Sequence, residues 1–134
     1  MKTQERWKIG RTTVYNIGYH IIWCSKYRRN VLTDGVDVRL KELLNEKAEE
    51  YECEIKAMEV MPNHVHIFIK TIPTLPIHFI IQQLKGYSAH VLRKEFPRLK
   101  SRIPNLWTRS YYIESVGNVS RENIQKYIEN QKNK

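Results

Sequence analysis

The sequence predicts an α+β domain in which helices cover one face of an antiparallel four-stranded sheet. Two observations lead to this prediction. Segments rich in β-branched and aromatic residues alternate along the chain with segments whose apolar residues recur at helical spacing. A Pro-Asn pair also lies between two adjacent strand-like segments, which is typical of a hairpin turn. Because 134 residues fit one domain, we expect residues 1–134 to fold as a single unit.

The first half of the chain supplies three predicted strands and one helix. Residues 13–27 are rich in β-branched and aromatic side chains and predict a long strand. Residues 34–51 predict a helix, because apolar residues recur on one side and acidic residues occupy the other. In residues 53–61 and in residues 64–71, apolar and polar side chains alternate, which predicts two strands. The turn at Pro62-Asn63 joins them as a hairpin.

The second half supplies two helices and one strand. The first of these helices has Thr74 as its candidate N-cap and ends before Pro97. Residues 98–105 predict a basic loop, residues 106–116 a fourth strand and residues 120–131 a last helix. The first six elements have the order β-α-β-β-α-β of the ferredoxin-like or RRM-like arrangement, whose second sheet face is free. We expect the last helix to pack near that open face.

The charge of the chain favours a polyanionic partner. There are 23 Lys and Arg against 14 Asp and Glu, which gives a net charge of +9. Residues 1–30 carry +6 and residues 85–134 carry +7, whereas residues 31–84 carry −4. Nucleic acid is the natural partner of such an excess, since each cation that meets a phosphate releases counterions. Solubility alone is the other explanation that charge leaves open.

Composition also argues against several classes of protein. No apolar run approaches the length of about 20 residues that a membrane helix needs. The first residues lack the apolar stretch of a signal peptide. Cys24 and Cys53 have neither metal-ligand spacing nor the pattern of a disulfide framework. We therefore expect a cytoplasmic protein.

Two histidines share the open face of the predicted sheet. Strand residues two apart point to the same side, so His64 and His66 lie on one face, and Val65 and Ile67 lie on the other. The apolar pair suits the face under the helices, which leaves the imidazoles on the open face. Their Cβ atoms would lie about 7 Å apart, a span that two imidazoles close onto one divalent ion. Taken alone, however, a His-x-His pair is more often incidental than a metal site.

The last predicted helix adds a tyrosine and an amide oxygen. Tyr127 and Gln131 are four residues apart and share one helix face. A phenol one helical turn from an oxygen donor suits a tyrosine nucleophile that attacks a phosphodiester with the help of a metal. Gln131 would then be a third, neutral ligand beside the histidines. Taken alone, however, a helix tyrosine is more often a packing residue than a nucleophile, and Tyr127 would then pack beside Ile124 and Ile128.

Together, these signals resemble a known family. The hexapeptide MPNHVH at residues 61–66 resembles the HUH motif of the IS200/IS605-type single-tyrosine (Y1) transposases. The pentapeptide YIENQ at residues 127–131 resembles their C-terminal Y-x-x-x-Q signature. Similar blocks are HIIWCSKYR at 20–28, LKGYS at 84–88 and LW at 106–107. The resemblance covers nearly the whole chain, and no motif position departs from it.

The resemblance implies a metal-dependent transposase that cleaves and rejoins single-stranded DNA at stem-loops marking element ends. Tyr127 would be the nucleophile and would form a 5′-phosphotyrosine link, leaving a free 3′-OH. His64, His66 and Gln131 would bind Mg²⁺ or Mn²⁺. Coordination chemistry alone would favour zinc for two imidazoles; in the family, phosphate oxygens and water complete the shell.

The resemblance also implies partners and location. Family members act as homodimers on single-stranded DNA with imperfect hairpins, often with the tyrosine helix serving the partner's histidine pair. We expect a cytoplasmic, nucleoid-associated enzyme of a prokaryote, with no membrane contact.

Further basic and aromatic residues are candidates for DNA contacts. For any single lysine, a solvated surface is the simpler explanation. Trp23, Tyr87, Trp107, Tyr111 and Tyr112 are suited to stacking on bases, although strand aromatics usually pack in a core or an interface. His20, His78 and His90 lack partners at ligand spacing, and the sequence assigns them no role. The candidate phosphate-binding residues are Lys8, Arg11, Lys26, Arg28, Arg29, Lys85, Arg93 and Arg109.

Two alternatives to a transposase remain at this point. The first is a non-catalytic RRM-like module that binds single-stranded RNA or DNA and needs neither Tyr127 nor a metal. Such a module would carry aromatic residues where His64 and His66 stand. The second is a domesticated HUH nickase, which would share the chemistry but would not rejoin paired ends.

Overall fold

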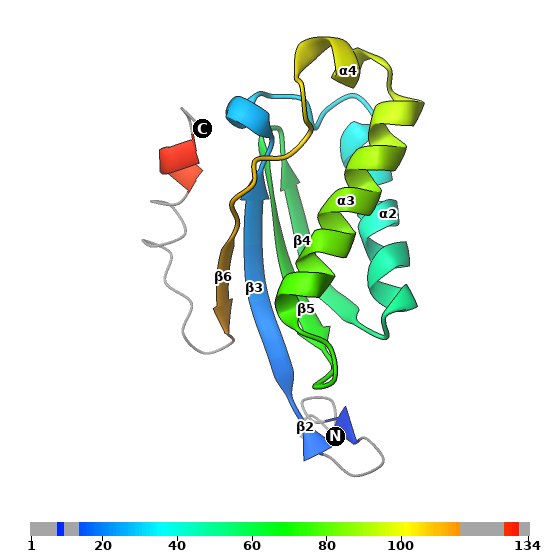
Figure 1. Ribbon diagram of the computed structural model, residues 1–134, viewed down its shortest axis with the longest axis vertical. Helices are drawn as coiled ribbons and strands as arrows, with labels where there is room; N and C mark the ends of the chain where they lie inside the picture. Colours follow the sequence, from blue (N-terminus) through cyan, green and yellow to red (C-terminus); the bar gives the residue numbers. More distant parts are fainter. Residues whose placement is uncertain (1–7, 10–13, 116–127, 132–134) are drawn as a thin grey trace.

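A four-stranded antiparallel sheet forms the centre of the protein. The computed structural model describes residues 8–9, 14–115 and 128–131. Strands β3 (Ile17–Cys24) and β5 (His64–Thr71) lie in the middle, and β4 (Glu54–Met61) and β6 (Tyr112–Ser115) form the edges. The strand order is β4-β5-β3-β6, and every neighbouring pair is antiparallel. This order confirms the predicted ferredoxin-like arrangement of an α+β fold (Figure 1).

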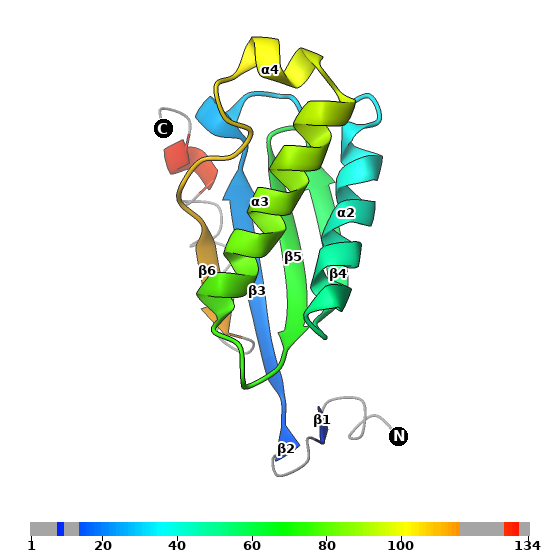
Figure 2. The same ribbon diagram turned by 45° about the vertical axis from the view of Figure 1, so that its right-hand side comes forward.

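Two helices cover one face of this sheet. Helix α2 (Val36–Glu50) and helix α3 (Ile77–Glu95) lie side by side, as Figures 1 and 2 show from two directions. Both were predicted from their apolar spacing. The core between helices and sheet contains fully buried residues from both layers, among them Leu40, Ile81 and Ile67. Truncating such a side chain to alanine costs about 2–5 kcal/mol of stability.

The central hairpin was predicted most closely. Strand β5 spans the predicted residues 64–71, and β4 begins one residue later than expected. The pairing runs from Met61↔His64 at the turn to Glu54↔Lys70, with an irregularity between Ile55 and Ala57. Buried and half-buried residues alternate along the whole of β5.

The predictions around helix α3 were wrong in two details. Thr74 is not the N-cap: the capping position is Pro76, and no side chain caps this helix end. Residues 98–105 are not all loop, because Arg98–Arg102 form the short helix α4. Pro97 precedes it with a φ of −55°, which is compatible with the start of a helix. The proline that ends α3 therefore also helps to begin α4.

The first and fourth strands are shorter than predicted. Strand β3 ends at Cys24, and the 3-10 turn η1 (Lys26–Arg28) follows, with positive φ at Tyr27 and Arg28. Nearer the N-terminus, β1 (Lys8–Ile9) and β2 (Val14–Tyr15) form a separate small sheet.

The predicted fourth strand, residues 106–116, contributes only residues 112–115 to the sheet. The Lys85 ammonium accounts for part of this difference, because it donates hydrogen bonds to the backbone carbonyls of Thr108, Arg109 and Ser110. Those carbonyls are therefore engaged by a side chain. Among the residues that the structure describes, the isolated bridge Ser25↔Trp107 is the one further pairing between the segment before β6 and the segment after β3.

The predicted last helix, residues 120–131, falls largely outside the described residues. Residues 128–130 are helical, and Gln131 continues with a 3-10 geometry. In the described part of the chain, no helix combines the length and apolar character needed to cross a membrane.

Candidate active site on the open sheet face

The histidine pair lies on the face of the sheet that the two long helices leave uncovered, as predicted. His64 and His66 are half-buried, whereas Val65 and Ile67 are fully buried in the core beneath the helices. Successive residues of strand β5 point to opposite faces of the sheet, so its alternating polar and apolar side chains are separated onto the two faces. The two imidazoles therefore stand together outside the core.

The open face is not exposed along its whole length. Ile22 lies directly across from His66, and Cys24 lies directly across from His64. Cross-strand neighbours share a face, yet Ile22 and Cys24 are both fully buried. The histidines thus border a covered part of the sheet. Burial also raises the pKa of the Cys24 thiol to about 11.

The His64 ring is oriented by its sequence neighbour. Its Nδ1 lies 2.8 Å from the amide oxygen Oδ1 of Asn63, which can only accept a hydrogen bond. The proton of a neutral His64 therefore resides on Nδ1, and the lone pair of Nε2 is available to a ligand. This arrangement suits a metal-binding imidazole.

His66 is hydrogen-bonded to a third histidine that the sequence did not identify. The Nδ1 of His20 lies 3.2 Å from the Nε2 of His66. The His20 ring is also stacked on Phe68, with centroids 4.9 Å apart and an interplanar angle of 10°. His20 pairs with Phe68 across β3 and β5, so His66 is its diagonal neighbour. Only the strand register, and no local spacing, could have indicated this contact.

Burial holds the imidazoles of the site neutral. It is the main cause that lowers the pKa of His20, His64 and His66 below the ordinary value. The positive charge of Arg28 lowers the pKa of His64 further, and His20 does the same for His66. The Glu59 carboxylate raises both pKa values but does not outweigh burial. Neutral imidazoles are the form that binds a metal ion.

Residues 128–131, near the end of the sequence, form hydrogen bonds with Arg28 and Ser110. The Arg28 guanidinium donates a hydrogen bond of 2.9 Å to the backbone carbonyl of Ile128. The Ser110 hydroxyl donates one of 2.9 Å to Oε1 of Gln131, which is 4 % exposed. Because Arg28 also acts electrostatically on His64, it connects the histidine pair with residues 128–131. Tyr127 itself lies outside the described residues.

The donors that could serve a divalent cation here are neutral. Among the residues that the structure describes, no cluster of three His, Cys, Asp or Glu side chains of metal-site type is present. The available donors are the Nε2 of His64, the imidazole of His66 and the amide oxygen of Gln131, which retains a lone pair beside its bond to Ser110. Ligation through Nε2 of His66 would require the contact with His20 to be given up.

The predicted phosphate-binding residues occupy different environments. Arg29 and Arg109 are exposed, and the Lys26 ammonium lies 5.2 Å from the ring centroid of Tyr27. Lys8 belongs to β1, and Arg11 lies outside the described residues.

Three other predicted cations bind backbone carbonyls. The groups concerned are the guanidinium of Arg28, that of Arg93, which donates to Ile103, and the ammonium of Lys85. Burial lowers the pKa of Lys85 to about 8. These contacts give the three side chains structural roles. DNA binding by the eight candidate phosphate-binding residues stays a prediction.

Two of the aromatic candidates belong to the core. Trp23 is fully buried, and Trp107 is 7 % exposed and packs edge-on against it, with ring centroids 5.8 Å apart. The interpretation of strand aromatics as packing residues is confirmed for this pair.

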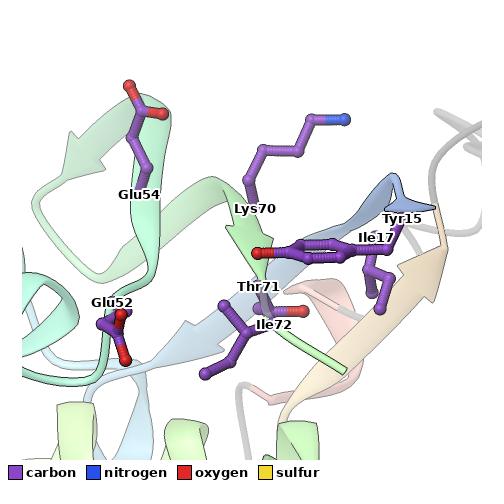
Figure 3. Close-up of a pocket in the computed structure, with 7 residues that line it drawn as sticks. All are labelled: Tyr15, Ile17, Glu52, Glu54, Lys70, Thr71 and Ile72. Atoms are coloured by element: carbon purple, nitrogen blue, oxygen red, sulfur yellow. The ribbon is translucent and has the colours of Figure 1, made fainter. Parts of the chain in front are cut away.

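Two cavities lie along strand β5, at different distances from the histidine pair. One, of about 210 Å³, includes His20 and His66 in its wall. The other, of about 170 Å³, lies around Lys70 and Tyr15 (Figure 3). Since Lys70 is six residues from His64 on an extended strand, the second cavity is about 20 Å away from the histidine motif. The first cavity is therefore the one relevant to the site.

Comparison with known proteins agrees with this arrangement. Residues 13–131 match the model of a family described as "Transposase IS200 like". The ISDra2 transposase TnpA of Deinococcus radiodurans is 43 % identical over 129 residues, which are 95 % of this chain and 92 % of that protein. The chain belongs to the IS200-like transposase family.

Other relatives extend the comparison. A transposase of insertion sequence element IS200 from Salmonella typhimurium is 30 % identical over 121 residues, 89 % of this chain and 79 % of the relative. The crystal structure of a protein from Deinococcus radiodurans described as a "putative transposase" has a TM-score of 0.87 at 42 % identity, and the match covers 92 % of this chain and 97 % of that chain.

A more distant structure shares the fold. A REP-associated tyrosine transposase bound to a REP hairpin has a TM-score of 0.59 at 14 % identity, covering 90 % of this chain and 67 % of that chain.

Proposed function

We propose that this IS200-like transposase cleaves and rejoins single-stranded DNA at stem-loop-marked ends through a covalent 5′-phosphotyrosine intermediate on Tyr127. The observation that carries the proposal is the pair of neutral imidazoles on the open face, linked through Arg28 to residues 128–131. Tyr127 directly precedes this segment in the sequence. The alternative of a pure binding module explains neither feature.

In the proposed reaction, the phenol of Tyr127 releases its proton to solvent as its oxygen attacks the scissile phosphorus. The bond from phosphorus to the 3′ oxygen breaks, and that oxygen leaves as a 3′-OH after taking up a proton. The phosphotyrosine retains the energy of the phosphodiester bond, so the 3′-OH of a second end can displace the tyrosine and rejoin the strands. No nucleotide cofactor is needed for either step.

His64, His66 and Gln131 would hold Mg²⁺ or Mn²⁺. When bound, the ion would neutralise charge on the phosphoryl oxygens and orient the phosphate. The protein's own contribution is to keep both imidazoles unprotonated by burial and, through the bond from Nδ1 of His64 to Asn63, to leave the Nε2 lone pair of His64 available. Ser110 meanwhile holds the Gln131 amide in place.

Hairpin DNA and a second copy of the chain are the proposed partners. The hairpin-bound structure of the REP-associated transposase, which has the same fold, supports a stem-loop ligand. The net charge of +9 supports binding to a polyanion. A homodimer would allow the tyrosine segment of one copy to act beside the histidines of the other.

Adduct formation tests the catalytic part of the proposal. Labelled single-stranded hairpin DNA is incubated with Mg²⁺ and the protein, and the products are separated on a denaturing gel. We expect the wild type to form a stable protein–DNA adduct and Tyr127→Phe to form none. Tyr27→Phe is the matched control, because Tyr27 is 47 % exposed and should not affect the adduct.

The remaining outcomes distinguish the alternatives. Binding without any adduct in the wild type would identify an RRM-like binding module. Adduct formation without joined products, when two cleaved ends are supplied, would identify a nickase that does not rejoin paired ends.

A further inference from the structure

The cavity beside the histidine pair has features that the proposed strand transfer does not use. It measures about 210 Å³ and is lined by His20, Ala57, Met58, Glu59, His66 and Phe68. Drug-sized ligands occupy pockets of about 300–1,000 Å³, so this cavity suits a single small ring system. Because His66 forms part of its wall, any occupant would lie next to a proposed metal ligand.

One wall of the cavity is a stack of two rings. The imidazole of His20 and the ring of Phe68 lie nearly parallel, 10° apart, and both side chains are half-buried. Rings that leave part of their surface accessible are the usual platforms for unpaired bases, since every base offers a π-face. Ala57 lies directly across from Phe68 on the other side from His20, and its small side chain leaves room beside the Phe68 ring.

The cavity wall also includes a carboxylate. Glu59 lies directly across from His66 and is exposed. Within the described residues, its carboxylate makes no hydrogen bond or ion pair, whereas Glu42, Glu50 and Glu95 on the helices all pair with cations. A carboxylate repels phosphate but accepts hydrogen bonds from amino groups on base edges. The chemistry of the cavity therefore favours a base over a phosphate.

We propose that this cavity binds an unpaired nucleobase with an exocyclic amino group, stacked on the His20–Phe68 pair and hydrogen-bonded to Glu59. The inference rests on the proposed function, since it supposes that single-stranded DNA crosses the open face beside His66. It assigns a base preference to the protein itself at this position: cytosine is accepted, and thymine, which presents a carbonyl oxygen instead of the amino group, is disfavoured.

Binding of oligo-dC and oligo-dT, measured by fluorescence anisotropy at one salt concentration, tests the proposal. The two bases have the same ring size but differ at C4, N3 and C5, so it is the change in the ratio of the two dissociation constants between wild type and Glu59→Gln that tests the contact with the amino group. We expect the wild type to bind oligo-dC about tenfold more tightly than oligo-dT. In Glu59→Gln, the amide can donate to the thymine carbonyl, so the ratio should fall to near one or reverse.

Two further variants make the test specific. Glu54→Gln removes the same charge from the other end of β4 and should leave the ratio unchanged, which separates base recognition from a general loss of repulsion. Ala57→Leu fills the space beside the Phe68 ring at an exposed position and should remove the preference. Equal binding of both oligomers by the wild type, or an unchanged ratio in Glu59→Gln, would overturn the inference.

Failure of the proposed function would look different. Suppose that the protein formed no Tyr127-dependent adduct, but that its preference for oligo-dC over oligo-dT still depended on Glu59. The cavity would then bind a base in a protein that does not cleave DNA. If adducts formed and the ratio were near one, cleavage would stand and the base site would be wrong.

Discussion

The Nδ1 of His20 lies 3.2 Å from the Nε2 of His66, so a residue of β3 fixes the ring of a proposed metal ligand on β5. Partners of this kind set the orientation and tautomer of a ligating histidine. The contact also occupies the nitrogen that faces His20. We infer that His20 is a positioning residue that holds the His66 ring through Nε2, which leaves Nδ1 of His66 as the nitrogen that would bind a metal ion.

Replacing His20 by alanine should weaken metal-dependent cleavage. We expect His20→Ala to raise the Mn²⁺ concentration needed for half-maximal adduct formation by about 10–100-fold. Titration of Mn²⁺ in the adduct assay measures this midpoint. His90→Ala, at an exposed position of α3, is the control and should leave it unchanged. An unaltered midpoint in His20→Ala would show that the contact does not position His66.

The metal-free protein should lose stability as the pH falls below neutrality. The pKa values of His20, His64 and His66 are lowered in the folded state, mainly by burial. A histidine with a lowered folded pKa stabilises the fold above the unfolded pKa of about 6.5, and this contribution is lost as the pH falls through the folded pKa. Urea unfolding between about pH 7.5 and pH 5 measures the loss.

A double variant identifies the groups responsible. In His64→Gln, His66→Gln, the fall in unfolding free energy over that pH range should be smaller, because two of the three groups that protonate on unfolding are gone. If the wild type and the double variant gave parallel curves, other residues would govern the pH dependence.

Lys85→Met should destabilise the protein. The ammonium donates to the carbonyls of Thr108, Arg109 and Ser110, with the shortest distance 2.7 Å, and methionine leaves these acceptors without that donor. We expect a loss of about 2 kcal/mol in the free energy of unfolding by urea. Lys41→Met, at an exposed position of α2, controls for the removal of one charge. Equal stability of the two variants would show that the three hydrogen bonds contribute nothing net.

Gly86→Ala should stabilise the protein. Gly86 lies inside helix α3, and a Cβ built there meets no atom within 4 Å. Alanine restricts the unfolded chain and has the higher helix propensity, so we expect a gain of about 0.5–1 kcal/mol. Thermal unfolding measures it. A lower melting temperature than that of the wild type would contradict the open environment of this position.

The sequence was sufficient for those parts of the fold that depend on local periodicity. The boundaries of β5 and the side taken by His64 and His66 follow from alternation alone, and the strand order follows from the sequence of elements. Helix α2 was similarly predictable from its buried stripe, which includes Leu40 and Leu44. Local pattern is reliable here because each element buries one complete face.

The features that the sequence could not supply depend on contacts between distant segments. His20 and His66 are 46 residues apart, and only the register of β3 against β5 brings them together. The fourth strand was predicted too long because nothing in residues 106–111 reveals that Lys85, on α3, binds the carbonyls there. The role of Arg28 in linking the two ends of the chain was hidden for the same reason.

Mass spectrometry of the protein–DNA adduct tests the central claim most directly. After digestion, the peptide carrying the 5′-linked nucleotide is sequenced for the wild type and for His64→Ala and His66→Ala. We expect the nucleotide on Tyr127 in the wild type and no adduct in either histidine variant. A nucleotide on another residue, or undiminished modification of Tyr127 without both histidines, would contradict a shared site formed by the histidine pair and the end of the chain.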